Sequence, residues 1–596
     1  MINSLGIVDI AVVVGLLLFL VIASMYSSFK KKNSEEYFMA GRSLKWYSVA
    51  GSIFGTNIHA QQIIGMMGVG YSIGFAQSHY EVLAIPAILI LCYVFIPIYR
   101  KTQVFTLSQF LENRYSSTAR LAYTILMIIF ILVQLIAGFY IGSRTLGLLF
   151  AGSGMEVSYL NGIITIAIIT VIFTVFGGME SVVVADNILT VVMIIAVLLI
   201  GTLTYMQPEI GGLSGLLKLD HAEANKMHLY LPSNHPKLPW AGIFTGLIIQ
   251  HFFYWTTNQY QVQRVLAAET DRDAKLGTIA AGFLKLIIPF FSIAAGVAAF
   301  YLFKARFGAD AIKPDDTFIT LLKTVVPSNY GFIGLILAGL ICAIFSAIYS
   351  MMNSVTTMLS FDVYKKYINP HASDNQTVSF GRIFVFVMCA VACVFAYTTY
   401  NPNSSDNFFL KLADQSSYLK PSLVVAFFWG VLWRKTNPKA AVIVLFSGPF
   451  IGLGVDYLYN DILVNYDWIK ELLGEKLNFL YRVFAIATIG SVLIYFLSNY
   501  FNARGGRPKQ HDLSVSFDGV RNQVFAFLAV QLVFIIIIQI GLVSPQNLSY
   551  LAALVAFGFF YKHIKTSNEE IAFYKSDVFY AGLLTSVTVW ILYYFA

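Results

Sequence analysis

Long apolar stretches alternate with short polar ones along the whole chain. Clear examples run from Ile7 to Ser24, Leu121 to Tyr140, Leu189 to Tyr205, Val483 to Leu497 and Val524 to Ile540. Stretches of this kind approach the length of about 20 residues that a helix needs to cross a hydrocarbon core of about 30 Å. Within lipid the backbone must satisfy its own hydrogen bonds, which a helix does inside one segment. The pattern therefore predicts an all-α polytopic membrane protein.

We expect 14 to 16 transmembrane helices along the sequence. The first predicted span covers residues 7–28, and a first group of five follows at residues 47–70, 77–99, 119–148, 158–176 and 184–206. A polar stretch from Gln207 to Pro239 contains several glycines and prolines and predicts an extracellular loop with a short surface helix. The second group covers residues 240–266, 275–303, 330–361, 379–398 and 407–433. The remaining predicted spans are 439–458, 477–499, 521–541, 547–561 and 577–595.

The order of these spans indicates an internal repeat. Two groups of five spans each open with a span unusually rich in polar residues, as inverted-repeat transporters do. An odd number of spans in each group would make the two repeats point opposite ways across the membrane. We divide the chain accordingly into residues 1–45 (an extra transmembrane helix and a cytoplasmic loop), 46–206 (first five-helix repeat), 207–239 (extracellular loop), 240–434 (second, inverted five-helix repeat) and 435–596 (peripheral helices).

Composition and charge agree with a membrane protein. Of the 596 residues, 58% are hydrophobic and only 12% are charged, whereas soluble domains have about 25% charged residues. The net charge of +8 could indicate an anionic partner, but the lysines and arginines gather in alternate loops. This cytoplasmic bias of positive charge places the N-terminus outside and argues against nucleic-acid binding. We expect a multi-pass protein of the cell membrane, in a bacterial inner membrane, because long soluble regulatory loops are absent.

The sequence contains no enzyme motif in a suitable context. Its glycine clusters do not follow predicted strands, so nucleotide binding is not expected. The histidines are scattered, and the four cysteines lie in apolar stretches without the spacing of a zinc site. We therefore expect a protein that is not an enzyme.

The predicted span that opens the first group is rich in polar residues. Residues 51–68 contain Asn57, His59, Gln61 and Gln62 among four glycines. Glycines make this segment a poor continuous helix, and a break would free backbone carbonyls to coordinate a cation. Such amides also form hydrogen bonds between packed helices, but four polar residues beside glycines favour a binding site.

Two other predicted spans carry isolated charges. Ionisable groups within spans are costly and are functional candidates. Glu81 follows His79 and Tyr80, and Lys285 is the one charge in the middle of its span. Glu81 could lie at the outer boundary of the membrane, and Lys285 could extend towards an interface. Placed well inside its span, Lys285 needs a partner such as Glu81 or a substrate oxygen.

Three further patterns leave two interpretations open. Tyr254 and Trp255 suit the apolar face and hydroxyl rim of a sugar, or an aromatic belt at the membrane boundary. The small-residue stripe around Ser346 favours close helix packing, although its hydroxyls and carbonyls could also bind sodium. Asp186 is either an ordinary acid at a helix N-terminus or a functional group.

Four segments resemble the sodium:solute symporter family, and within it the sodium/glucose (galactose) cotransporters. They are Asn57 to Gly74, Asn258 to Ala268 with its NQYxxQRxLAA pattern, Gly177 to Asp186, and Met352 to Tyr364. The resemblance covers roughly residues 5 to 540. It implies a leucine-transporter-type fold of two inverted five-helix repeats with alternating access. It also implies import of a glucose- or galactose-like monosaccharide coupled to transported sodium.

The resemblance further implies roles for individual residues. The sugar site would fall on Asn57, Gln62, Tyr80, Glu81 and Lys285, with His251 beside it. A hydrophobic gate would fall on Met66, Tyr254, Trp255 and Phe409. Sodium would be bound by carbonyls of Gly55, Ile58 and Ala343 and the hydroxyl of Ser346, with Asp186 on the ion exit.

The sequence departs from the family pattern at three of these places. Ala347 stands where a second hydroxyl ligand for sodium is usual, Ala413 replaces a sugar-contacting glutamine, and His251 replaces an asparagine near the gate. The alternatives are a symporter of the same fold for an inositol, a nucleoside or a carboxylate, and coupling to protons. A third is a membrane receptor that binds solute without transporting it.

Overall fold

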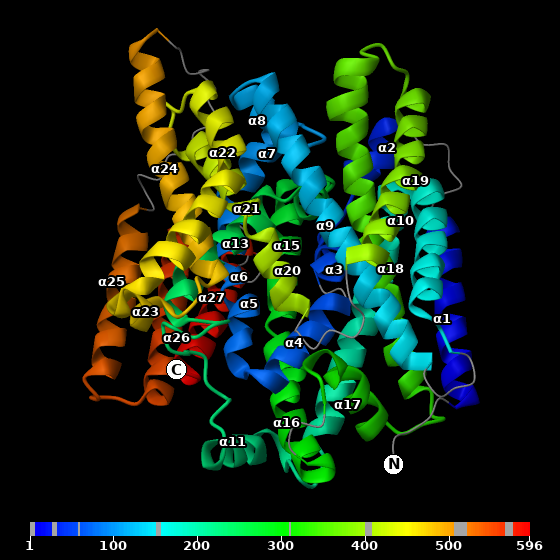
Figure 1. The fold of residues 1–596 in the computed structure, drawn as a ribbon, viewed down its shortest axis with the longest axis vertical. Coiled ribbons are helices and arrows are strands. Elements are labelled where there is room, and N and C mark those ends of the chain that lie inside the picture. Colours follow the sequence, from blue (N-terminus) through cyan, green and yellow to red (C-terminus); the bar gives the residue numbers. More distant parts are fainter. Residues whose placement is uncertain are drawn as a thin grey trace.

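The computed structural model describes residues 6–26, 33–57, 60–150, 156–308, 312–399, 408–505, 521–566 and 576–596. Across these residues the chain is almost entirely helical, and β-pairing is limited to two isolated bridges. Ten of the described helical segments are long and apolar enough to cross a membrane. Figure 1 shows α8 (Leu107–Arg114) at one end of the bundle and α11 (Gly212–Ala222) at the other, which is also the end where the N-terminus is marked. The N-terminus and the 207–239 loop, which we predict to be extracellular, thus share one end.

The first predicted span and the five spans of the first group coincide with helices. These are α1 (Ile7–Tyr26), α3 (Trp46–Asn57) with α4 (Ala60–Ser72), the run from α5 (His79–Val82) to α7 (Ile96–Lys101), α9 (Ser117–Phe150) and α10 (Tyr159–Tyr205). The opening span is thus helical on both sides of residues 58–59. The last element differs from the prediction, because one helical element stands where we expect two spans.

The contacts of α10 divide it into two arms that pack on α18 (Phe332–Met358) and α19 (Asp374–Thr399). In the first arm, Tyr159 contacts Ala396 and Ala167 contacts Cys389, so this arm runs antiparallel to α19. In the second arm, Met179 contacts Asn353 and Asp186 contacts Ser346, so this arm runs antiparallel to α18. Because α18 and α19 are themselves antiparallel neighbours, joined where the Ser360 hydroxyl donates to Thr377 O, the arms run in opposite directions. Element α10 therefore contains both predicted spans.

The second group is built from shorter pieces. Its helices are α12 (Trp240–Gly242), α13 (Ile248–Phe252), α14 (Gln259–Leu266), α15 (Asp271–Lys285), α16 (Ala294–Phe307), α18, α19, α20 (Phe408–Ser416) and α21 (Lys420–Leu432). The 240–266 segment is interrupted at Asn258, whose φ of −91° and ψ of 119° are extended. The single span predicted at 407–433 is wrong in one respect, since a turn at residues 417–419 separates α20 from α21. Pro421 lacks the N–H that would continue the helical hydrogen bonds of α20.

The remaining helices form one side of the bundle, shown in yellow to red in Figure 1. They are α22 (Pro438–Tyr457), α24 (Phe479–Ala503), α25 (Arg521–Gln539), α26 (Pro545–Thr566) and α27 (Asp577–Tyr594). The segment predicted as a short span at 547–561 lies within the longer helix α26, which has 22 residues. Short helices that the apolar pattern does not predict are α2 (Ser34–Met39), α8, α17 (Thr317–Val325) and α23 (Asp467–Leu473).

A charged network closes the end of the bundle that contains α8. Arg120 at the start of α9 forms ion pairs with Glu112 at 2.5 Å and with Asp362 at 2.8 Å. Lys366 lies 2.7 Å from the other oxygen of Glu112. Burial opposes the ionisation of Glu112, but hydrogen bonds from these cations and from Ser117 outweigh it and lower its pKa to about 2. The network therefore stays charged at physiological pH and ties α8 to α9 and to residues 359–368.

Glycines allow α4 to lie directly against the 289–307 segment. A Cβ at Gly296 would lie 2.2 Å from the Met67 carbonyl oxygen, and one at Gly70 would lie 2.3 Å from the Ile293 carbonyl oxygen. These distances leave no room for a side chain, so the two backbones are in contact. This packing fixes the position of α4.

Replacing Gly296 by alanine should destabilise the protein by about 1–3 kcal/mol, because a rigid backbone carbonyl blocks the added methyl group. The expected result is a lower melting temperature of the detergent-solubilised chain, measured by size-exclusion chromatography of heated samples. Gly454→Ala is the matched control, since a Cβ at Gly454 meets nothing within 4 Å. Equal melting temperatures for the two variants would contradict the proposed contact.

Candidate functional site

Helix α3, helix α4 and an interrupted helix meet in the centre of the bundle. The interruption is at Asn258, which separates residues 253–257 from α14. Helix α3 packs against α14, and the Gln261 amide donates to Ile53 O at 3.5 Å. Interrupted helices expose backbone groups that have no helical partner, and transporters use such groups to bind ions and solutes.

A buried ion pair joins α3 and α4 to neighbouring helices. Lys285 Nζ lies 2.5 Å from Glu81 Oε2 and donates to Asn57 Oδ1 at 2.7 Å. The Gln62 amide donates to Glu81 Oε1 at 2.5 Å. The pairing of Lys285 with Glu81 confirms the sequence-based expectation. The network connects the end of α3, the first turn of α4, α5 and α15, and all four side chains are at most 7% exposed.

The local sequence explains how Lys285 reaches this position. Helix α15 ends at Lys285, and the chain continues through tighter turns in which Leu286 N donates to Phe283 O and Ile287 N to Leu284 O. Pro289 has no N–H to bond to the carbonyl of Lys285, so the regular helix cannot continue. The end of α15 projects the lysine towards Asn57 at the end of α3.

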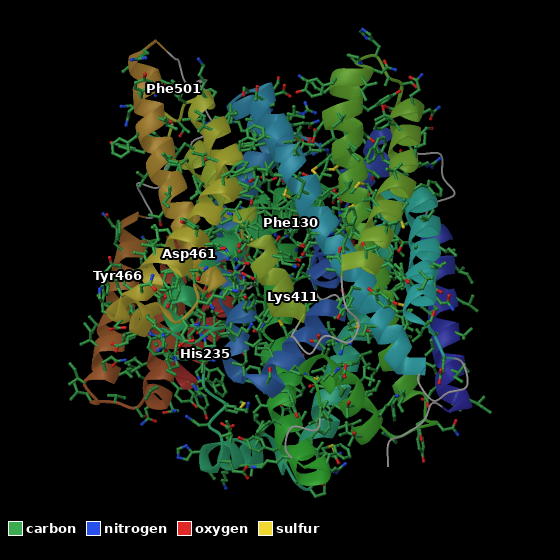
Figure 2. All side chains as sticks on the ribbon, viewed as in Figure 1. Phe130, His235, Lys411, Asp461, Tyr466 and Phe501 are labelled. Carbon is green, nitrogen blue, oxygen red and sulfur yellow. The ribbon has the colours of Figure 1, made fainter. Side chains whose placement is uncertain are left out.

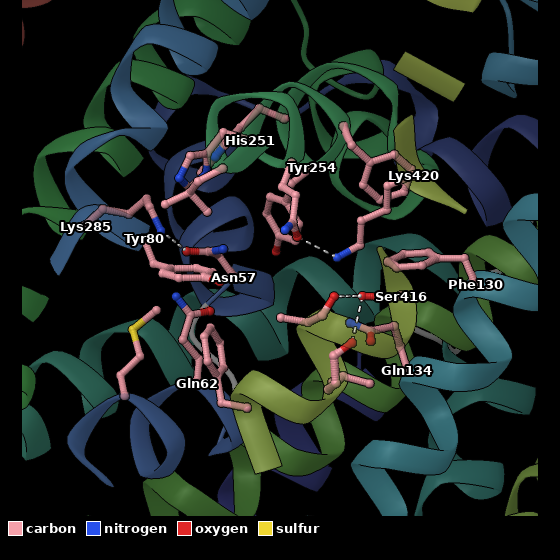
Figure 3. A pocket seen from close by; sticks show the side chains of 18 residues that line it. Asn57, Gln62, Tyr80, Phe130, Gln134, His251, Tyr254, Lys285, Ser416 and Lys420 are labelled. Carbon is pink, nitrogen blue, oxygen red and sulfur yellow. Dashed lines mark hydrogen bonds between the residues drawn. The ribbon is translucent and has the colours of Figure 1, made fainter. Parts of the chain in front are cut away.

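A cavity of about 120 Å³ adjoins this network (Figure 3). A water molecule needs roughly 10–15 Å³ on the same measure, so the cavity can hold a small organic molecule. The residues that line it are Asn57, Gln62, Met66, Tyr80, Phe130, Gln134, Leu247, Gln250, His251, Phe253, Tyr254, Trp255, Lys285, Phe409, Leu412, Ala413, Ser416 and Lys420. Every residue predicted for the sugar site and the gate lines this cavity, except Glu81. Glu81 lies behind the wall and contacts the lining residues Gln62 and Lys285.

Aromatic rings form much of the cavity wall. The Tyr80 ring lies edge-on to Phe409 with centroids 5.2 Å apart, and the rings of Tyr254 and Trp255 are 5.6 Å apart. Lys285 Nζ lies 5.6 Å from the centre of the Trp255 ring. Flat rings with polar tips provide both apolar contact and hydrogen bonding.

Several buried polar atoms in the cavity wall lack a hydrogen-bond partner among the described residues. They are Tyr80 Oη, Gln134 Oε1, Gln250 Nε2, His251 Nε2 and Tyr254 Oη. A buried polar group that stays unpaired costs about 1–3 kcal/mol. These atoms are therefore available to hydrogen-bond a polar ligand.

A second polar cluster surrounds Asp186, on the other side of α3. Its carboxylate accepts hydrogen bonds from Ser52 at 2.6 Å and from Thr56 at 3.2 Å, and a further one from Ser346. Arg264 Nη2 lies 3.5 Å from the same carboxylate. Carboxylate and hydroxyl oxygens are the ligands that hard cations prefer. A hydrogen bond thus joins Ser346, predicted to bind sodium, to Asp186, predicted to lie on the ion exit.

The other predicted sodium residues have different outcomes. Gly55 lies beside Asp186, since a Cβ there would be 2.8 Å from the Asp186 carbonyl oxygen. Ala343 is buried one turn before Ser346 on α18. Ile58 lies outside the described residues. Their roles as ligands stay predictions.

The sequence analysis missed several residues of both clusters. Arg264 lies in a segment quoted only as a family pattern, although a buried arginine demands an anionic partner. Lys420 lies inside the predicted 407–433 span, where the rule that flags Lys285 would also have flagged it. Gln134 and Gln250 carry no comparable signal, because single amides in spans usually serve helix packing.

A bundle of membrane-spanning helices that encloses a buried polar cavity, with one helix interrupted at Asn258, is typical of a secondary transporter. Comparisons with known proteins identify the type. The model of the sodium:solute symporter family matches residues 37–448. The chain therefore belongs to the sodium:solute symporter family, a family of multi-pass membrane transporters that use sodium as the coupling ion.

Individual relatives agree with this assignment. A sodium/glucose cotransporter of Vibrio parahaemolyticus is 30% identical over 444 residues, covering 70% of this chain and 79% of the relative. The sodium/myo-inositol cotransporter 2 of Homo sapiens is 27% identical over 524 residues, covering 82% and 76%. A solved Na+-coupled sialic acid symporter has a TM-score of 0.71 at 20% identity, covering 83% of this chain and 98% of its own. The fold is the predicted leucine-transporter type.

Removing the ammonium of Lys285 should destabilise the protein more than removing both partners of the pair. In Lys285→Met the Glu81 carboxylate stays buried without its cation, which costs about 3–5 kcal/mol. In the double variant Glu81→Gln/Lys285→Met no unpaired charge remains. The melting temperature in detergent should be lowest for the single variant.

Lys304→Met provides the matched control, because the Lys304–Glu223 ion pair at 2.7 Å is half exposed and such pairs contribute little. A single variant as stable as the double one would show that Lys285 does not compensate a buried charge.

Proposed function

We propose that this symporter imports a monosaccharide, or a solute with the same size and hydroxyl pattern, together with sodium. The observation that carries the proposal is the buried network of Asn57, Gln62, Glu81 and Lys285 beside the cavity. Amide, carboxylate and ammonium groups together offer both donors and acceptors, which suits several neighbouring hydroxyl groups. The relatives named for glucose and myo-inositol, two polyhydroxylated solutes, support this substrate class.

Discrimination would come from buried polar groups. Gln62 and Asn57 are nearly inaccessible to water outside the cavity, as their exposures of 7% and 5% indicate. A solute that lacks one hydroxyl would leave such a group unpaired, which can lower transport by orders of magnitude. We assign Tyr80 and His251 to the same surface, because their free atoms Oη and Nε2 have no other partner among the described residues.

Sodium and solute would share one helix. We place the ion among the oxygens around Asp186, where Ser52 and Thr56 of α3 meet Ser346 of α18. Asn57 ends the same helix and contacts Lys285 in the solute network. Sodium binding would therefore fix α3 and complete the solute site. The membrane potential would supply about 2.3 kcal/mol per charge per 100 mV.

We further propose that residues 46–206 and 240–434 are the two inverted repeats, whose relative movement opens the cavity alternately to each side. Met66, Tyr254, Trp255 and Phe409 would close the cavity on one side. All four line it beside the solute network.

Uptake by proteoliposomes tests the solute site. With an inward sodium gradient, labelled monosaccharides and myo-inositol should accumulate above the outside concentration, whereas nucleosides should not. Gln62→Ala and Lys285→Ala should abolish this uptake when equal amounts of folded protein are reconstituted, because each leaves polar groups of the network without a partner. Lys304→Ala, which removes an exposed lysine from α16, should transport normally.

Normal uptake in both site variants would refute the solute site. Binding without accumulation would identify a receptor instead of a transporter.

The sodium dependence of uptake tests the second cluster. Asp186→Asn and Ser346→Ala each remove an oxygen ligand or its charge, so the sodium concentration for half-maximal uptake should rise at least tenfold. Thr488→Ala, which removes a hydroxyl from the exposed face of α24, should leave it unchanged. Uptake driven equally by a proton gradient without sodium would contradict the placement of the ion.

A further inference from the structure

One cation in the cavity has no acidic partner. Lys420 is the first residue of α21 and lines the cavity. Its Nζ donates to Gln250 Oε1 at 3.1 Å and lies 5.6 Å from the centre of the Phe130 ring. Among the described residues, no carboxylate forms an ion pair with it. Nearby Asp414 is 52% exposed and pairs with Arg482 instead.

The position of Lys420 is electrostatically unfavourable without a ligand. A charge within a membrane-spanning segment is costly. A cation at the N-terminal end of a helix is also opposed by the helix dipole. Lys285 has the Glu81 carboxylate 2.5 Å away to offset such a cost, whereas Lys420 has only a neutral amide and an aromatic ring.

Lys420 also determines which atom Gln250 offers to the cavity. A lysine ammonium can only donate hydrogen bonds, so the Gln250 side chain must present its oxygen to it. The amide nitrogen of Gln250 then points away and has no partner, although the residue is 7% exposed. This end of the cavity therefore holds unused donors from Lys420 and Gln250. Charged donors of this kind bind carboxylates with short, strong hydrogen bonds.

The two ends of the cavity differ in charge. Glu81 and Lys285 neutralise each other at one end. Figure 3 shows Lys420, with Phe130 and Ser416, on the opposite side of the cavity from Lys285. The charged side chains that line or touch the cavity thus carry a net charge of one positive unit, located at the end away from Glu81.

We infer that the transported solute is a sugar acid whose carboxylate is bound by Lys420 and Gln250 while its hydroxyls meet the Asn57–Gln62–Glu81–Lys285 network. This inference rests on the proposed function and narrows its substrate class to a monosaccharide with an anionic group, such as a hexuronate. Glu81 does not repel the carboxylate, because Lys285 compensates its charge and the two carboxylates occupy opposite ends.

The experiment compares an acidic with a neutral sugar. The purified full-length chain is reconstituted with an inward sodium gradient, and the initial uptake of labelled glucuronate and galacturonate is measured against glucose and galactose. The wild type should prefer the uronates at least tenfold. Lys420→Gln should lower this preference at least tenfold, and Lys420→Arg should retain most of it. Lys304→Gln, which removes an exposed lysine from α16, should keep the wild-type preference.

The possible results separate the two proposals. Sodium-driven uptake of neutral sugars, with a uronate preference that is absent or unchanged in Lys420→Gln, overturns the inference and leaves the proposed function standing. Absence of sodium-driven uptake of every sugar in the wild type refutes the proposed function itself. If Lys420→Gln is unstable, stabilisation of the detergent-solubilised wild type by uronate but not by glucose still supports the inference, and equal stabilisation overturns it.

A bound chloride ion is the other source of a negative charge at this position. In that case neutral sugar uptake would fall when external chloride is replaced by sulfate, and Lys420→Gln would lose this dependence. That outcome would overturn the sugar-acid assignment, whereas uronate uptake independent of chloride agrees with it.

Discussion

The ion pair between Glu81 and Lys285 is the constraint on which the centre of the molecule depends. Neither charge is stable alone away from water, so α5 and α15 must stay close enough for a 2.5 Å contact. The same two side chains bind Asn57 at the end of α3 and Gln62 in the first turn of α4. Charge compensation therefore holds both helix ends in place, and the side chains of Asn57 and Gln62 line the cavity.

A short helix connects the two polar clusters. Asn57 belongs to the network of Glu81 and Lys285, and Ser52 and Thr56, less than two turns earlier on α3, donate hydrogen bonds to Asp186. A displacement at one cluster is therefore transmitted to the other by the rigid helix α3, without a long chain of intervening side chains. Gly55 lies between them and allows α3 to approach the backbone at Asp186 closely. Coupling between ion and solute would thus depend on one element.

The sequence contained most of the fold and part of the site. Apolar length predicts the spans because lipid demands continuous helices, and the rule against lone charges in spans predicts the pairing of Lys285 with Glu81. The turn between α20 and α21 escaped prediction because one span was drawn across the polar run from Asp414 to Ser417 and the following Pro421, which mark the turn. Helix α17 escaped because it is too short to span. The bonding of Ser346 and Arg264 to Asp186 depends on which faces of α10, α14 and α18 meet, and a single sequence contains no such information.

The unpaired charge of Lys420 also concerns how the transporter responds to voltage. A cavity that opens alternately to each side carries this ammonium through part of the membrane field each time the protein changes state. A full crossing would correspond to about 2.3 kcal/mol at 100 mV, and a partial crossing to a proportional fraction. The empty carrier would therefore produce a transient current of its own. A carboxylate bound to Lys420 would cancel that charge movement, so the loaded carrier would be less sensitive to voltage at this position than the empty one.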